Sequence, residues 1–127
     1  MPVLHFTVPG TPQPKQRPRR TADGVWYTPR STRRYEDRVA GYALAAGARW
    51  RPGTYSVTVA LYFPDRRRRD LDNCVKALLD GLNGVVWADD AEVTQLHVSK
   101  HLDPHTPRAE VVVRPAALST TTGQSGV

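Results

Sequence analysis

The chain has one cysteine, Cys74, so it can form neither an internal disulfide nor a four-cysteine zinc site. The absence of internal disulfides suits a reducing compartment. No apolar run approaches the roughly 20 residues that a membrane-spanning helix needs. The first ten residues also lack the basic and apolar regions of a signal peptide. These absences predict a cytoplasmic protein with no membrane partner.

Lysine is scarce as well. Of the 18 basic residues 15 are arginine, and only Lys15, Lys76 and Lys100 are lysine. The formal net charge of +6 favours nucleic acid or an anionic membrane as a partner, but no basic amphipathic helix with a bulky apolar face is present. Arginine matches phosphate oxygens in pairs, although a GC-rich genome would also replace lysine by arginine. The composition therefore leaves nucleic acid as the favoured partner, with no small-molecule cofactor expected.

The hydrophobic pattern predicts one α+β domain over residues 1–115. Alternating apolar residues predict strands at 3–8, 54–63, 92–102 and 108–115, with the last two joined as a hairpin. A turn at Asp23-Gly24 precedes another brief strand. Helical spacing predicts helices at 31 to about 49, capped by Ser31 and Thr32, and at 71–83. This order predicts a mixed sheet with two helices packed on it, and the small polar residues 116–127 predict a disordered tail.

Basic side chains gather in three segments. They are a proline-rich arm after the first strand, the exposed face of the helix 31–49, and a run of four arginines before the helix 71–83. Trp26 and Tyr27, beside the arm, are weaker candidates for stacking on bases. We predict backbone contacts to nucleic acid from Lys15, Arg17, Arg19, Arg20, Arg33, Arg34, Arg66, Arg67, Arg68 and Arg69.

The arginine run leads directly into Asp70 and Asp72, with Lys76 one helical turn further on. Each feature has an ordinary structural explanation. Asp70 could cap the helix, Asp72 and Lys76 could form an i,i+4 pair, and Asp89-Asp90 could be a turn. The arginines could belong to a solvated loop.

Together these residues favour a catalytic site. If the segment after Gly84 folds back along the helix, with Trp87 anchored in the core, Asp89 and Asp90 approach the first two acids. Gathered carboxylates repel one another unless a hard cation such as Mg²⁺ or Mn²⁺ relieves them. Such an ion can polarise a phosphodiester and activate water, while Lys76 could stabilise the transition state or protonate the leaving oxygen. His101 and His105 are predicted to be ordinary surface residues.

The segment from Phe63 to Val93, "FPDRRRRDLDNCVKALLDGLNGVVWADDAEV", resembles the signature of the RusA family of Holliday junction resolvases. Looser similarity extends over 3–114. The resemblance implies a small α+β fold, a homodimer, and Mg²⁺-dependent cleavage of four-way DNA junctions. It places the catalytic, metal-binding aspartates at Asp70, Asp72 and Asp90 and the essential lysine at Lys76. Ala88, Glu92 and Cys74 depart from the common pattern, and the roles of Asp89 and Glu92 stay open.

We therefore expect a Holliday junction resolvase acting in DNA recombination or repair. Two alternatives remain: a metal-dependent nuclease of flap or single-strand specificity, and a non-catalytic basic DNA-binding module. A four-way junction is two-fold symmetric, so two symmetric nicks favour a homodimer. Its interface is best sought at "EVVVRP" or at 85–87, although both segments read equally well as core.

Overall fold

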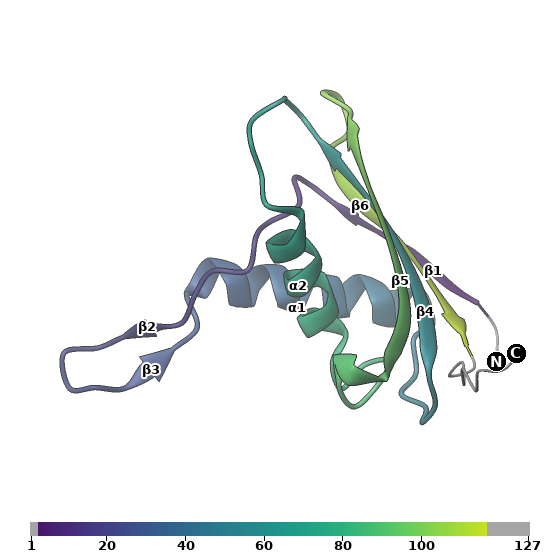
Figure 1. The fold of residues 1–127 in the computed structure, drawn as a ribbon, viewed down its shortest axis with the longest axis horizontal. Helices are drawn as coiled ribbons and strands as arrows, with labels where there is room; N and C mark the ends of the chain where they lie inside the picture. Colours follow the sequence, from purple (N-terminus) through teal and green to yellow (C-terminus); the bar gives the residue numbers. More distant parts are fainter. Residues whose placement is uncertain (1–2, 117–127) are drawn as a thin grey trace, which may run out of the picture.

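Within residues 3–116, which the computed structural model describes, four strands form one mixed sheet and two helices cover one of its faces (Figure 1). In sheet order the strands are β1 (Leu4–Pro9), β6 (Arg108–Pro115), β4 (Tyr55–Phe63) and β5 (Val93–Leu102). The other elements are the short strands β2 (Arg19–Arg20) and β3 (Trp26–Tyr27), the helices α1 (Arg30–Ala45) and α2 (Leu71–Leu82), and the 3-10 turn η1 (Asp90–Glu92). The predicted α+β class is confirmed.

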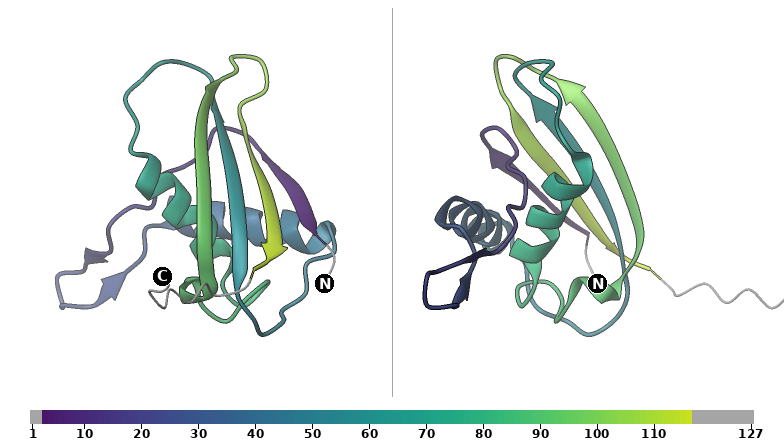
Figure 2. Two further views of the ribbon diagram at one scale, coloured as in Figure 1. Left: turned by 45° about the vertical axis from the view of Figure 1, so that its right-hand side comes forward. Right: turned by 60° about the vertical axis from the view of Figure 1, so that its left-hand side comes forward.

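The core lies between the sheet and the helices. Along β4 the side chains of Tyr55, Val57, Val59, Leu61 and Phe63 are all buried, as their alternation predicted. One stripe of each helix meets this face. In both views of Figure 2 the opposite face of the sheet carries no helix. The same pattern that forms the core therefore places α2, and every polar residue on it, on one side of the molecule.

The order of the last strands corrects the predicted hairpin between 92–102 and 108–115. β5 pairs parallel to β4, and β6 pairs antiparallel to the other side of β4, so β4 separates the two. α2 carries the chain back to the end of the sheet where β4 begins, so β5 runs parallel to β4. Residues 103–107 then pass the end of β4, where the Asp103 amide donates to the Phe63 carbonyl at 2.8 Å. A five-residue connection fits either arrangement, so its length misled the prediction.

The start of α1 also differs from expectation. Pro29 occupies the N-cap, and no side chain caps the helix. Thr32, predicted as a cap together with Ser31, is instead buried, and its Oγ1 accepts a hydrogen bond from the Gln16 amide at 3.1 Å. The helix ends at Ala45 rather than near 49, where Gly47 adopts a positive φ of 100°. The proline-rich arm is thus fastened to α1 by the residue expected to cap it.

The two segments considered for a dimer interface belong to the core. In β6, Val111 and Val113 are buried, with β1 and β4 on either side. Val86 and Trp87, in the segment that follows α2, are buried. The predicted tail lies outside the described residues except for Ala116, whose amide donates to the Thr54 carbonyl at 2.9 Å. No helix of the described part is long and apolar enough to cross a membrane.

The helices approach each other closely at Gly81. A Cβ there would lie 2.9 Å from the Glu36 carbonyl oxygen and 3.0 Å from Val39 Cβ. Overpacking of this kind costs about 1–3 kcal/mol, against a gain in helix propensity of about 1 kcal/mol. We expect Gly81→Ala to lower the free energy of unfolding in urea, by about 1 kcal/mol net.

Gly41 supplies the matched control, because it lies within α1 and a Cβ there would meet nothing within 4 Å. Gly41→Ala should raise the free energy of unfolding by about 0.5–1 kcal/mol. Equal stabilisation by both substitutions would contradict the close approach of the helices.

Candidate active site

The first turn of α2 places two carboxylates at the end of the arginine run. Asp70 is the N-cap, and its Oδ1 accepts the amides of Asp72 and Asn73 at 3.0 and 3.4 Å. Its Oδ2 accepts the Asn73 side-chain amide at 3.2 Å. The capping explanation for Asp70 is therefore confirmed. The exposed Asp72 carboxylate makes no hydrogen bond or ion pair to the described residues, and it lines grooves on both sides of the helix start.

The four arginines of the run do not share one environment. Arg66, Arg67 and Arg68 are exposed. Arg69 folds back instead: its Nη1 lies 2.7 Å from Asp65 Oδ1, and its guanidinium lies 4.6 Å from the centre of the Phe63 ring. Only 18% of its side chain is exposed. Arg69 thus holds the loop between β4 and α2 together, and three arginines remain turned to solvent.

The segment after α2 folds back along the helix, as the sequence predicted. Trp87 is fully buried, and its Nε1 donates to Asn83 Oδ1 at 2.9 Å. The chain then enters η1, where Asp90 Oδ2 lies 3.0 Å from Lys76 Nζ. Lys76 and Asp90 are 14 positions apart in the chain, and their contact joins η1 to the middle of α2.

Lys76 also contacts Asp80, whose Oδ1 lies 3.2 Å from Nζ. The predicted pair with Asp72 is not formed among the described residues; Lys76 binds the acids one turn later and on η1 instead. Asp80 Oδ2 in turn lies 3.0 Å from Lys15 Nζ, which is 2.6 Å from Glu36 Oε2. Asp80 was given no role from the sequence. Its spacing of i+4 from the lysine was the signal available.

Both lysines are held in the charged form. The pKa of Lys76 is raised, chiefly by the bond to Asp90 and then by the bond to Asp80. Partial burial lowers the pKa of Lys15, but its bonds to Glu36 and Asp80 outweigh this and raise it overall. An ammonium group at Lys76 can therefore stabilise negative charge on a nearby phosphate.

A shallow groove of about 280 Å³ runs beside these residues, between α2 and the edge strand β5. Asp72 and Lys76 form its polar part. Its apolar lining comes from Leu71, Val75, Leu79, Leu96 and Val98. A second groove of about 520 Å³ lies at the helix start, lined by Asp70, Asp72, Leu71, Arg68 and Arg69. Asp72 faces both grooves, so cationic and acidic groups meet at one end of α2.

The donor set suits a hard divalent cation in part. Carboxylates are the ligands that Mg²⁺ prefers, and this ion usually takes one or two of them together with waters and substrate phosphates. Within residues 3–116 no three His, Cys, Asp or Glu side chains are close enough to enclose a metal ion. Asp72 is exposed and has no ion pair among these residues, and Asp90 is bound to Lys76. These two carboxylates suit an Mg²⁺ ion that also takes waters and substrate phosphates, rather than an ion enclosed by protein ligands.

The acids beside Asp90 have structural contacts. Asp89 caps η1, and its Oδ1 accepts the Ala91 amide at 3.3 Å. Glu92 Oε1 accepts the Ala88 amide at 3.3 Å, so it braces the same turn. His101 and His105 are exposed, as predicted. Both acids therefore shape the turn that carries Asp90.

The other predicted DNA-contacting residues lie on the surface, with one difference. Lys15 is engaged with two carboxylates, and its side chain is 24% exposed. The remaining basic residues are exposed along the arm and the start of α1: Arg17, Arg19, Arg20, Arg33 and Arg34. Arg33 and Arg34 also line a polar hollow of about 510 Å³ with Arg30 and Tyr27, which sequence reasoning did not connect.

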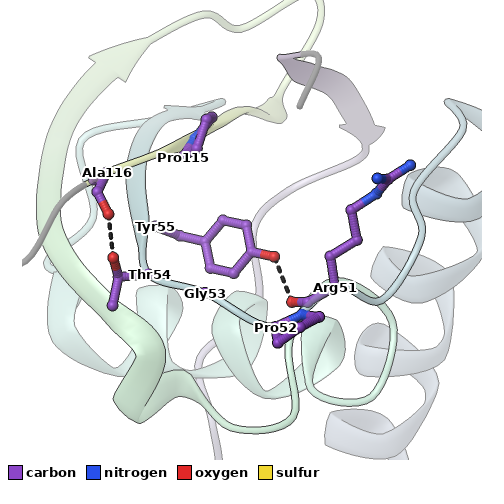
Figure 3. Close-up of a pocket in the computed structure, with 7 residues that line it drawn as sticks. All are labelled: Arg51, Pro52, Gly53, Thr54, Tyr55, Pro115 and Ala116. Atoms are coloured by element: carbon purple, nitrogen blue, oxygen red, sulfur yellow. Dashed lines mark hydrogen bonds between the residues drawn. The ribbon is translucent and has the colours of Figure 1, made fainter.

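A further pocket, at the start of β4, has a different character (Figure 3). It has a volume of about 460 Å³ and is lined by residues 51–55, Pro115 and Ala116. The Tyr55 ring points toward Arg51, and its hydroxyl donates to the Arg51 carbonyl at 2.6 Å (Figure 3). Its lining contains no carboxylate, so the residues suited to metal-dependent hydrolysis lie on α2 and η1 instead.

The chain is similar to known proteins over part or most of its length. The family model described as Endodeoxyribonuclease RusA matches residues 9–114. The crossover junction endodeoxyribonuclease RusA of Shigella sonnei is 35% identical over 81 residues, which are 63% of this chain and 62% of the relative. The proteins of the same name in Escherichia coli K12 and in Enterobacteria phage 82 are each 47% identical over 45 residues, 35% of this chain and 38% of the relative.

The matches cover less than two thirds of the length of these curated relatives. The family model, however, spans most of this chain, from the end of β1 to the end of β6, and includes every candidate site residue. The chain therefore belongs to the RusA family of endodeoxyribonucleases.

Proposed function

We propose that this protein is a metal-dependent endodeoxyribonuclease that resolves four-way DNA junctions in the cytoplasm. The observation that carries the proposal is the contact between Lys76 and Asp90, 3.0 Å apart, on the same helix face as Asp72 in a chain of the RusA family. The name that its relatives carry, crossover junction endodeoxyribonuclease, supplies the substrate class.

The residues of the chain divide the work by charge. The exposed Arg66, Arg67 and Arg68 lie next to the acids and suit contacts with backbone phosphates. Lys76, kept protonated by Asp90 and Asp80, suits a position against the scissile phosphate, where negative charge grows in the transition state. Asp90 thereby orients the lysine, and the acids at the start of α2 lie one turn away.

Mg²⁺, or Mn²⁺ in its place, would be held by carboxylates from Asp70, Asp72 and Asp90, which would have to move closer together around the ion than they are in this structure. When bound it would polarise the phosphodiester and lower the pKa of a water molecule. Asp72 is the best placed of the three, because its oxygens are free of other described side chains, whereas Asp70 also caps the helix.

Competition between DNA substrates tests this function. A radiolabelled four-way junction is incubated with the protein and Mg²⁺, with unlabelled junction, flap or duplex of equal length as competitor. We expect paired, symmetric cuts that need the metal, and competition chiefly by the junction. Equal competition by the flap would assign the protein to a different nuclease specificity. Binding without metal-dependent cutting would leave only a DNA-binding module.

We also propose that the active form is a homodimer, because symmetric cutting of a two-fold substrate needs two equivalent sites. The edge strand β5 supports a contact surface: residues 95–102 are exposed, including Leu96, Val98 and Leu102. In sedimentation at micromolar concentration we expect a dimer that Leu102→Glu dissociates. Leu44→Glu, at an exposed leucine on α1, is the control and should leave the dimer intact. A monomeric wild-type protein would overturn this proposal.

The arginine run gives a sharper test of DNA contact. Arg67 has 82% of its side chain exposed and makes only a long contact of 3.8 Å with Asp65, whereas Arg69 has 18% exposed and lies 2.7 Å from Asp65. We expect Arg67→Ala to reduce the slope of log affinity against log salt by about 1. Arg69→Ala should leave that slope unchanged and lower thermal stability instead. Equal effects on the slope would show that Arg69 leaves its intramolecular partners to bind DNA.

A further inference from the structure

The hairpin β2–β3 extends away from the rest of the molecule (Figures 1 and 2). Its two strands pair only with each other among the described residues, and their side chains lie outside the core. It nevertheless carries exposed apolar groups: Val25 is 58%, Trp26 65% and Tyr27 45% exposed. Large aromatic side chains left in water gain nothing for the fold, so they indicate a surface that is covered by a partner.

Each face of this hairpin joins an arginine to an aromatic ring. Arg20 pairs with Trp26 across the strands, and Arg19 pairs with Tyr27. Directly opposed residues share a face, and successive pairs alternate between faces. The Arg20 guanidinium lies 5.8 Å from the centre of the Trp26 ring. A cation beside a flat ring suits a nucleotide, because the cation binds its phosphate and the ring stacks on its base.

The base of the hairpin is fixed to the catalytic helix. The Lys15 amide donates to the carbonyl of Asn73 at 2.9 Å, and Asn73 is next to Asp72. The Lys15 ammonium bonds Asp80 and Glu36, and the next residue, Gln16, bonds Thr32. Arg20 is five positions after Lys15 in the chain, so Arg20 lies within about 18 Å of that anchor. The hairpin is therefore held within reach of DNA that occupies the site.

We propose that the hairpin is a base-stacking arm, in which Trp26, supported by Tyr27, stacks on bases whose faces are exposed. In continuous duplex DNA every base is already stacked, whereas bases at a branch point or in a single strand offer a free face. The arm would thus favour branched over continuous DNA. This inference rests on the proposed nuclease function for its location, but stacking itself can be measured separately. The three arginines and one lysine from 15 to 20 match the charge of DNA better than that of an average protein surface.

The test uses the full chain without Mg²⁺, so that no substrate is cut. Affinities are measured for a four-way junction, a single strand and a duplex at one salt concentration. The junction carries 2-aminopurine either beside the branch point or in the middle of an arm. The variants are Trp26→Ala, Trp26→Phe, which keeps a ring, and Trp50→Ala, which removes a tryptophan with 51% exposure outside the hairpin.

We expect Trp26→Ala to bind the junction and the single strand about tenfold more weakly, since it loses the stacking of one aromatic ring on a base, and to bind the duplex as wild type does. Fluorescence of 2-aminopurine beside the branch point should change on binding of the wild type and less with the variant. Trp26→Phe should retain most of the affinity, and Trp50→Ala all of it.

Three outcomes would overturn the arm: unchanged binding by Trp26→Ala, equal losses on all three DNAs, or a change in oligomeric state in sedimentation, which would make the hairpin a protein contact. Failure of the proposed function looks different. If the wild type shows no preference for the junction, but Trp26→Ala still binds the single strand more weakly, the resolvase function is excluded and the stacking arm is retained.

Discussion

Asp72→Asn should abolish cleavage of a four-way junction while the protein still binds it. The substitution keeps the size of the side chain and removes the carboxylate that faces both grooves at the start of α2. Loss of one charged group that acts in the transition state costs roughly 100- to 1,000-fold in rate. Affinity for DNA should stay the same or rise, because a negative charge near the phosphates is removed.

Single-turnover cleavage and a binding titration without metal measure the two quantities separately. Asp70→Asn and Asp90→Asn should behave in the same way, and asparagine at position 70 retains the ability to cap α2. Glu110→Gln is the control: it removes one negative charge from β6, where Glu110 is paired with Arg108 at 2.7 Å and does not point into the core. Near wild-type cutting by Asp72→Asn would exclude that residue as a metal ligand.

Lys76→Ala should lower the cleavage rate by roughly 100-fold or more and change junction affinity much less. The ammonium is bound to Asp90 and Asp80 and has 52% of its side chain exposed, so it can meet a phosphate without leaving the helix surface. An interaction made only in the transition state affects rate rather than binding. Single-turnover rates at saturating protein isolate this effect.

Lys100→Ala removes the same charge from an exposed lysine on β5 and should cut at nearly the wild-type rate. The ammonium of Lys100 lies 5.7 Å from the centre of the Phe63 ring, and it makes no ion pair within residues 3–116. A Lys76→Ala protein that loses affinity but cuts normally once saturated would reassign Lys76 to phosphate binding.

Much of the fold follows from local pattern. β4 alternates over nine residues and α2 has a clear apolar stripe, and both appear within one or two residues of their predicted ends. The return of Trp87 to the core, and with it the approach of Asp90 to α2, was also predictable, because an apolar segment after a helix must find cover. What the pattern could not supply was strand order, since turn length alone does not distinguish a hairpin from a connection across β4.

The partners of individual side chains were the least predictable part of the site. Within a run of four arginines nothing in the sequence marks Arg69 as the one that turns inward to Asp65 and Phe63. Likewise Lys15 and Asp80 are 65 positions apart, and their contact exists only because the arm lies against α2. These contacts depend on tertiary packing. Residue type and spacing therefore predicted which residues form the basic segments, but not which side chains each of them contacts.

The position of β6 has a consequence for the synthesis of this protein. β6 follows all the other strands in the sequence, yet it lies between β1 and β4 in the sheet. Until residues 108–115 have left the ribosome, β1 has no partner strand in the described fold and one edge of β4 is open. The four-stranded sheet therefore cannot form early, and in a nascent or prematurely terminated chain α2 and η1 have no complete sheet to pack against. The carboxylates on α2 and η1 therefore reach their final arrangement only after nearly all of the described length has been translated.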